Sequence, residues 1–140
     1  RSAGGTVILV SNSPRSTAGI TRQLDDIGVP RACYDAVVTS GDVTRDLMQQ
    51  TDGKLYHLGP ARDLSLFERL PVERVPLEQA SAIICTGLLH EEQETPADYE
   101  PAFRAMIGRG LPMICEPGDS DATAVNSVWN RSRAAWSTNT

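Results

Sequence analysis

Three polar side chains follow the first apolar run of the sequence. Thr6–Val10 is continuous and rich in β-branched residues, and Ser11, Asn12 and Ser13 come directly after it. Such a run predicts a strand buried on both faces of a parallel sheet, and open α/β folds bind ligands at the carboxyl edge of the sheet. A hydroxyl there can donate to a phosphoryl oxygen, and the first amides of a following helix favour the same anion. The three residues are therefore candidates for binding phosphate, although Ser11 or Asn12 would serve equally well to cap a turn.

Strands and helices alternate after this segment. Ser16 or Thr17 can cap a helix that Gly28 and Pro30 end, and a short strand follows at Ala36–Val38. The helix shows its apolar face at i, i+4 and i+7, namely Ile20, Leu24 and Ile27. A second helix passes through Val43 and Leu47. This order of strand, helix, strand and helix is typical of a doubly wound α/β sheet.

The second half of the sequence predicts further strands at Lys54–Leu58, Val72–Val75, Ala82–Cys85 and Pro112–Cys115. Helices are expected at Asp63–Leu70 and after Thr95, where a capping box precedes an apolar stripe of Tyr99, Phe103, Met106 and Ile107. Residues 116–140 show a period of neither 2 nor 3.6. They predict a poorly ordered tail.

Composition excludes several classes of function. The net charge is −5 and aromatic residues make up 5%, which argues against binding nucleic acid or an anionic membrane. No apolar run approaches the roughly 20 residues of a membrane span, so a cytoplasmic protein without a membrane partner is expected. The cysteines, Cys33, Cys85 and Cys115, contain no Cys-x-x-Cys pair, and neither His57 nor His90 has a second ligand at metal-binding spacing.

Two of these segments together carry a family resemblance. An apolar strand ends in Ser11 and Asn12, and Thr39–Asp42 reads Thr-Ser-Gly-Asp. The stretch from Val7 to Asp46 resembles the haloacid dehalogenase superfamily, most closely the subclass IIA that carries an α/β cap after its second catalytic motif. The similarity covers about residues 3 to 115 and includes residues 56–60, 63–67, 85–88, 94–99 and 110–115.

This resemblance implies a fold and a function. It implies a partial doubly wound, Rossmann-like core in residues 1–53, part of an α/β cap in residues 54–115 and a divergent tail in residues 116–140. It also implies a magnesium-dependent phosphatase of small phosphorylated molecules. Ser11, Asn12 and Ser13 would bind the phosphate, and Ser40, Gly41 and Asp42 are possible further site residues, although Asp42 is equally suited to cap its own helix.

The sequence departs from the family at the motifs that supply its catalytic residues. It contains no aspartate pair on a strand, which in the family supplies the nucleophile and the general acid. Nothing matches the family's lysine motif, and the acidic sequence Gly118–Asp121 is interpreted as a coincidence, so the magnesium ligands are not expected in this chain. The start at Arg1 indicates an internal piece of a longer protein, and residues 116–140 are hypothesised to be out of frame or to derive from an incomplete coding sequence.

Three functions stay open on these grounds. The chain is an inactive fragment of a cap-bearing phosphatase, an active phosphatase completed by another chain, or a non-catalytic module that binds a ligand or protein through its cap. Because a central strand is missing, the run Thr6–Val10 is also expected to have an exposed edge through which the chain forms homo-oligomers.

Overall fold

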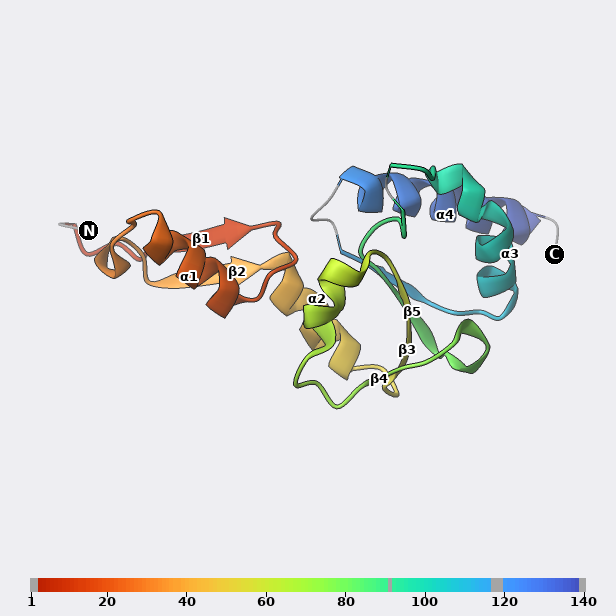
Figure 1. Ribbon diagram of the computed structural model, residues 1–140, viewed down its shortest axis with the longest axis horizontal. Coiled ribbons are helices and arrows are strands. Elements are labelled where there is room, and N and C mark those ends of the chain that lie inside the picture. The colour runs from red at the N-terminus through yellow and green to blue at the C-terminus, as the bar shows by residue number, and fades with distance from the viewer. Residues whose placement is uncertain (1–2, 91, 117–119, 139–140) are drawn as a thin grey trace.

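The strands form two separate parallel sheets (Figure 1). The computed structural model describes residues 3–90, 92–116 and 120–138. Strands β1 (Ile8–Ser11) and β2 (Ala36–Thr39) form the first sheet. The second sheet has the order β4-β3-β5-β6, and its strands are β3 (Lys54–Leu58), β4 (Glu73–Arg74), β5 (Ala82–Cys85) and β6 (Met113–Cys115).

Helical segments connect the parallel strands, as parallel pairing requires. The α-helices are α1 (Thr17–Asp26), α2 (Ser40–Gln49), α3 (Glu100–Gly108) and α4 (Ser120–Thr138). The described residues also include the 3-10 turns η1 (Arg31–Cys33), η2 (Ala61–Phe67), η3 (Leu77–Gln79) and η4 (Pro96–Tyr99). The predicted α/β class with parallel sheets is confirmed.

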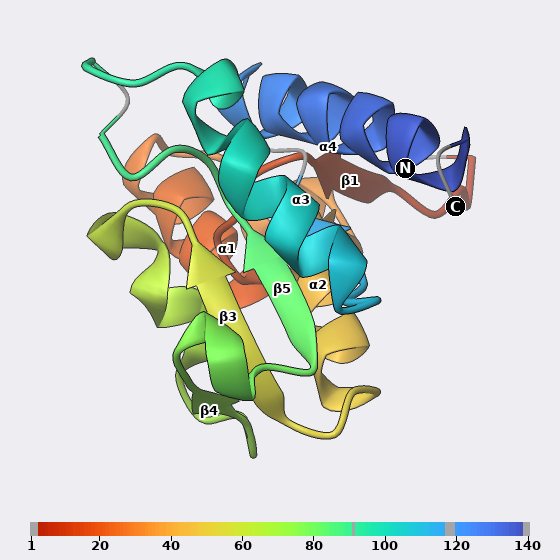
Figure 2. The same cartoon turned by 90° about the vertical axis from the view of Figure 1, so that its right-hand side faces the viewer.

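The second sheet is covered on both faces, which explains why β5 is wholly apolar. Successive residues of β5 point to opposite faces, and all four are buried. One face packs against α3 and α4 in a cluster that includes Ile83, Cys85 and Phe103. The opposite face packs against α2 and η2 in a cluster that includes Ile84 and Met48. Figure 2 shows α3 and α4 together on one side of this sheet.

Helix α2 contributes to the core of the second lobe. Met48 of α2 is fully buried against Leu55 and Leu66, so α2 packs with the second sheet. Helix α2 is therefore packed with the second sheet, and the predicted division of the chain at residue 53 stays a prediction. The reason is that the apolar side of α2 is needed to cover β3 and β5, while the first sheet is covered by α1. The identification of the two lobes as core and cap stays a prediction.

Strand β1 is not buried on both faces, contrary to expectation. Leu9 is half-buried and Val37 is buried, but Ile8 and Val10 are 56% and 80% exposed and Val38 is 43% exposed. The register pairs Ile8 with Ala36 and Val10 with Val38, so the exposed residues share one face. A two-stranded sheet with one covering helix leaves that face open to solvent.

The expectation of a poorly ordered tail is wrong for Ser120–Thr138, which form α4. Val125, Val128 and Trp129 recur at i, i+3 and i+4 and are buried against α3, where Trp129 meets the Phe103 ring edge-on at 5.6 Å. Three apolar residues are enough to stabilise this helix, because α3 provides an apolar surface on which they pack. Tertiary packing supplies most of a helix's stability. Within the described residues, no helix is long and apolar enough to span a membrane.

Candidate functional site

The two predicted polar segments lie side by side at the carboxyl edge of the first sheet. Ser11 of β1 pairs with Thr39 of β2, which brings the residues after each strand together. The Ser40 hydroxyl donates to the Ser11 carbonyl oxygen at 3.5 Å, and the Gly41 amide donates to the Ser13 carbonyl oxygen at 3.2 Å. The structure thus joins Ser11, Asn12 and Ser13 with Ser40, Gly41 and Asp42 in one locus, and their roles stay predictions.

Two hydroxyls in this locus are oriented by backbone amides. The Ser13 amide donates to Ser11 Oγ at 3.2 Å, and the Arg15 amide donates to Ser13 Oγ at 3.2 Å. A hydroxyl oxygen that accepts such a bond still has its own proton to donate. Asn12 between them is exposed. The loop can therefore present two hydroxyl donors and one amide group to a phosphate.

Gly41 is required by close packing. A Cβ atom at this position would lie 2.2 Å from the Pro14 carbonyl oxygen and 2.9 Å from that of Arg15. Gly41 is itself buried. Only glycine lets the start of α2 approach the loop that carries the serines this closely.

Asp42 occupies the N-terminus of α1, where the sequence predicted a phosphate. Its carboxylate accepts from the Thr17 amide at 2.9 Å and from the Thr17 hydroxyl. Ser16 caps the same helix by accepting from the Gly19 amide at 3.3 Å. The α2 helix is capped by Thr39 instead, whose hydroxyl accepts from the Asp42 amide at 3.1 Å. Asp42 thus caps the neighbouring helix rather than its own, and a helix N-terminus that favours an anion already has one.

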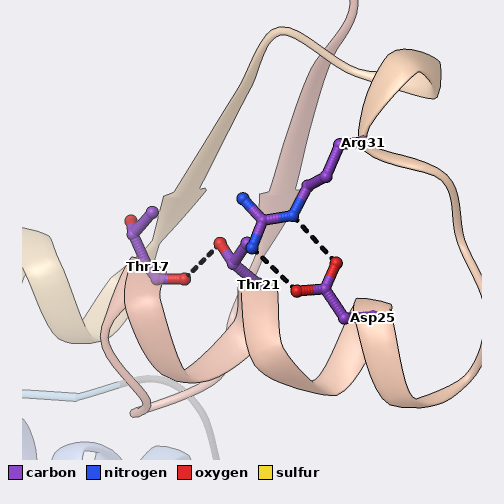
Figure 3. Close-up of polar contacts among 4 residues, drawn as sticks. All are labelled: Thr17, Thr21, Asp25 and Arg31. Carbon is purple, nitrogen blue, oxygen red and sulfur yellow. Dashed lines mark hydrogen bonds and ion pairs between the residues drawn. The ribbon is translucent and has the colours of Figure 1, made fainter.

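The C-terminal end of α1 is held by an ion pair (Figure 3). Arg31 donates to both carboxylate oxygens of Asp25 at 2.8 Å, which lowers the pKa of Asp25 below its usual value. Within the helix, the Thr21 hydroxyl donates to the Thr17 carbonyl oxygen at 2.7 Å. Bidentate pairing of this kind fixes the relative orientation of the two side chains. The ion pair therefore joins the turn η1, which precedes β2, to the C-terminal end of α1.

A pocket with a volume of about 680 Å³ lies between α1 and the second lobe. Four arginines line it, namely Arg15, Arg22, Arg45 and Arg69. None of these four arginines was predicted from the sequence as a site residue. A signal existed for Arg15 and Arg22, because Arg15 directly precedes the predicted cap of the first helix and Arg22 lies within that helix. Arg45 and Arg69 reach the pocket only through the tertiary fold.

The residues described do not fit the magnesium site that the family resemblance implies. No group of three or more His, Cys, Asp or Glu side chains lies together in the described parts of the chain. Asp42 is already bonded to Thr17. In the sequence Gly118–Asp121, Gly118 and Asp119 lie outside the described residues, as does the side chain of Asp121.

His57 is a packed side chain of the second lobe. Its Nε2 lies 2.9 Å from Thr86 Oγ1, and the Phe67 ring meets it edge-on at 5.2 Å. Burial, with a smaller contribution from the charge of Arg74, lowers the pKa of His57 to about 4. The ring is therefore neutral at pH 7. His90 is exposed and lies in the loop after β5.

Comparisons with known proteins point to one family. Residues 1–73 match the family model of the haloacid dehalogenase-like hydrolases. The fold is similar to the crystal structure of a hydrolase of the haloacid dehalogenase-like family from Brucella suis 1330, with 38% sequence identity and a TM-score of 0.75. The similarity covers 94% of this chain and 52% of the B. suis chain, so this chain spans about half of that relative. No curated protein matches.

Proposed function

The chain belongs to the haloacid dehalogenase-like hydrolases, and from this we propose that it is the phosphate-binding part of a phosphatase that acts on small phosphorylated metabolites. Family membership also indicates a metal cofactor. Because the described residues form no cation site, the role proposed for this chain is to bind the phosphate group. Its net charge of −5 favours neither a nucleic acid nor a membrane as partner.

The observation that supports this proposal most strongly is the position of Ser11. Ser11 is the last residue of the parallel strand β1, and the Ser13 amide donates to its hydroxyl oxygen at 3.2 Å. Hydrogen-bond donors that are held in place before the substrate arrives stabilise the charge that develops on a transferring phosphoryl group. Ser13 and Asn12 provide two further donors in the same loop.

The chain alone is proposed to be catalytically inactive. Phosphate monoesters hydrolyse so slowly in water that enzymes accelerate the reaction by up to ~10²¹. A nucleophile, a general acid and a metal supply most of this effect in phosphoryl transfer. Two serines and an asparagine can bind phosphate but cannot replace those groups.

A turnover assay together with a binding assay tests both parts of this proposal. With p-nitrophenyl phosphate and Mg²⁺, the purified chain should show no turnover above the rate in buffer. Inorganic phosphate should bind, as followed by ³¹P NMR line broadening, and Ser11→Ala should weaken that binding. Ser137→Ala on the exposed side of α4 is the matched control. Metal-dependent turnover that disappears when a carboxylate of this chain is altered would contradict the proposal.

A non-catalytic binding module is the second candidate. The observation that favours it is that the second lobe has its own four-stranded sheet with a hydrophobic cluster on each face. Binding of a ligand that is unaffected by Ser11→Ala, without turnover, would support this candidate. If adding a polypeptide with the family's aspartate motif restored turnover, the chain would instead be one half of an active phosphatase.

A further inference from the structure

The pocket between the two lobes has the size of a small-molecule site. Its volume of about 680 Å³ falls inside the range of roughly 300–1,000 Å³ that is usual for such sites. One wall is a single face of α1 and the residues before it, where Ala18 and Gly19 leave room. The other wall is formed by Arg45 of α2 and by residues at and after the end of η2, namely Ser65, Leu66, Glu68 and Arg69. Ser11, Asn12 and Ser13 do not line it.

The lining of the pocket carries a net positive formal charge, which favours an anionic ligand. Four arginines face two acidic residues, Asp26 and Glu68, which gives the lining a formal charge of 4 − 2 = +2. The whole chain has a formal net charge of −5. A positively charged cleft in an otherwise acidic protein attracts anionic ligands.

Two of the arginines are already fixed in place. Arg45 donates to the carbonyl oxygens of Leu66 at 2.7 Å and Glu68 at 2.9 Å, which holds the wall of the pocket. Arg15 donates to Gln23 Oε1 at 3.2 Å along the face of α1. In the parts of the chain that the structure describes, the side chains of Arg22 and Arg69 make no hydrogen bond or ion pair. These two guanidinium groups are therefore available to a ligand.

The backbone at Arg69 is strained. Its φ is 57°, and among the described residues it is the one non-glycine residue with a positive φ. A left-handed conformation is unfavourable for a residue that carries a side chain, and such residues are concentrated at functional sites. Here it occurs in the pocket wall, directly after the Glu68 carbonyl that Arg45 holds.

We propose that this pocket binds a small molecule carrying two or more linked phosphate groups, at a site separate from Ser11–Ser13. Guanidinium groups pair with phosphate oxygens in a bidentate manner, which favours phosphate over other anions. Arginines line two walls of the pocket, and a linked diphosphate offers more oxygens to pair with them than a single phosphate does. A bound ligand would bridge the two lobes and restrain their relative movement.

Isothermal titration calorimetry of the full chain with inorganic pyrophosphate tests this proposal. Arg22→Gln and Arg69→Gln should each weaken binding about tenfold, as expected for the loss of one charge-assisted hydrogen bond. Arg104→Gln is the matched control, because Arg104 is an exposed helix residue paired with Glu100 outside the pocket. Thermal unfolding of each variant checks that the fold is retained. Orthophosphate should bind the pocket more weakly than pyrophosphate.

The Ser11→Ala variant separates this site from the phosphate site proposed above. Pyrophosphate should bind Ser11→Ala as tightly as the unaltered chain if the pocket is the site. If both arginine variants bound pyrophosphate like the unaltered chain, or if Ser11→Ala alone abolished binding, the pocket would not be the site. Absence of pyrophosphate binding to the unaltered chain at millimolar concentration would also overturn the proposal, and would leave the function proposed for Ser11 to its own test.

Discussion

At the scale of single residues, Asp42 decides what the N-terminus of α1 can bind. A helix N-terminus attracts anions through unpaired amides and the helix dipole. The Asp42 carboxylate meets that need from within the chain by accepting from the Thr17 amide. A substrate phosphate must then rely on the hydroxyls of Ser11 and Ser13 rather than on the helix.

The first prediction follows from this bond. Asp42→Ala should lower the free energy of unfolding by about 1 kcal/mol, because the Thr17 amide loses its acceptor and the helix loses a favourable charge. Urea unfolding followed by circular dichroism measures the change. Asp46→Ala on the exposed side of the same helix is the control and should leave stability nearly unchanged. Equal effects of the two substitutions would argue against the capping role of Asp42.

The second prediction concerns the pH dependence of stability through His57. Burial keeps its ring neutral in the folded chain down to a pKa of about 4, whereas the unfolded chain takes up the proton near the usual value of 6.5. Between these values the unfolded state binds more protons, so stability falls as the pH falls. Allowing for solvent screening of a half-buried ring, we expect a loss of about 1–2 kcal/mol between pH 7 and pH 4.

Two variants isolate this contribution from that of the carboxylates. His57→Gln should flatten the loss in this window, because the group that titrates has been removed. His90→Gln, which alters an exposed histidine, should keep the same pH dependence as the unaltered chain. Unfolding free energies measured at several pH values supply the comparison. The assignment would be wrong if both variants lost stability in parallel with the unaltered chain.

At the scale of elements, the contact between α2 and the serine loop depends on Gly41. The third prediction is that Gly41→Ala destabilises the chain by about 1–3 kcal/mol, because its Cβ would overlap the Pro14 carbonyl oxygen and force the backbone apart. Gly19→Ala is the control. Its Cβ would make only ordinary contacts, 3.4 Å from Arg15 Cβ, and alanine is favoured in a helix by roughly 0.5–1 kcal/mol.

Gly41→Ala should alter phosphate binding by the serine loop, Ser11–Ser13, as well as the free energy of unfolding. Because the Gly41 amide donates to the Ser13 carbonyl oxygen, a shift of the start of α2 should also weaken phosphate binding in the NMR assay. Thermal unfolding with unchanged midpoints for both glycine variants would show that the close approach does not constrain the loop.

Elements whose pattern is local were predictable from the sequence. The bounds of β3 and β5 agree with the predicted strands, and Ser16 caps α1 as expected. The helix α4 was missed because its three buried residues span little more than one turn, and the surface that receives them comes from α3. The segment Ala61–Phe67 is a 3-10 turn where a helix was expected from Asp63 to Leu70.

The parts of the site that follow from strand pairing were predictable from the sequence, and the parts that depend on tertiary packing were not. The meeting of Ser11–Ser13 with Ser40–Asp42 follows from parallel pairing of the strands before them. The partner of the Asp42 carboxylate was not predictable, because two nearby helix N-termini compete for it. The arginine pocket depends on how the two lobes pack, which no local pattern encodes.

At the scale of the whole molecule, the first sheet presents a free edge and an open apolar face. Among the described residues β1 pairs only with β2, and Ile8, Val10 and Val38 are exposed on one face. Unpaired strand edges with apolar side chains promote pairing with another chain. We therefore propose that two copies of this chain associate through β1, which would pair its free edge and cover Ile8 and Val10.

The fourth prediction tests this association by size-exclusion chromatography with light scattering. The unaltered chain should elute with a mass above that of its 15.1 kDa monomer, and Val10→Glu should shift it toward the monomer, because a carboxylate on the open face opposes burial and two copies would bring like charges together. Val43→Glu is the matched control, since Val43 is an exposed valine of α2 away from β1. A compact monomer of the unaltered chain at high micromolar concentration, or equal behaviour of both variants, would exclude β1 as the interface.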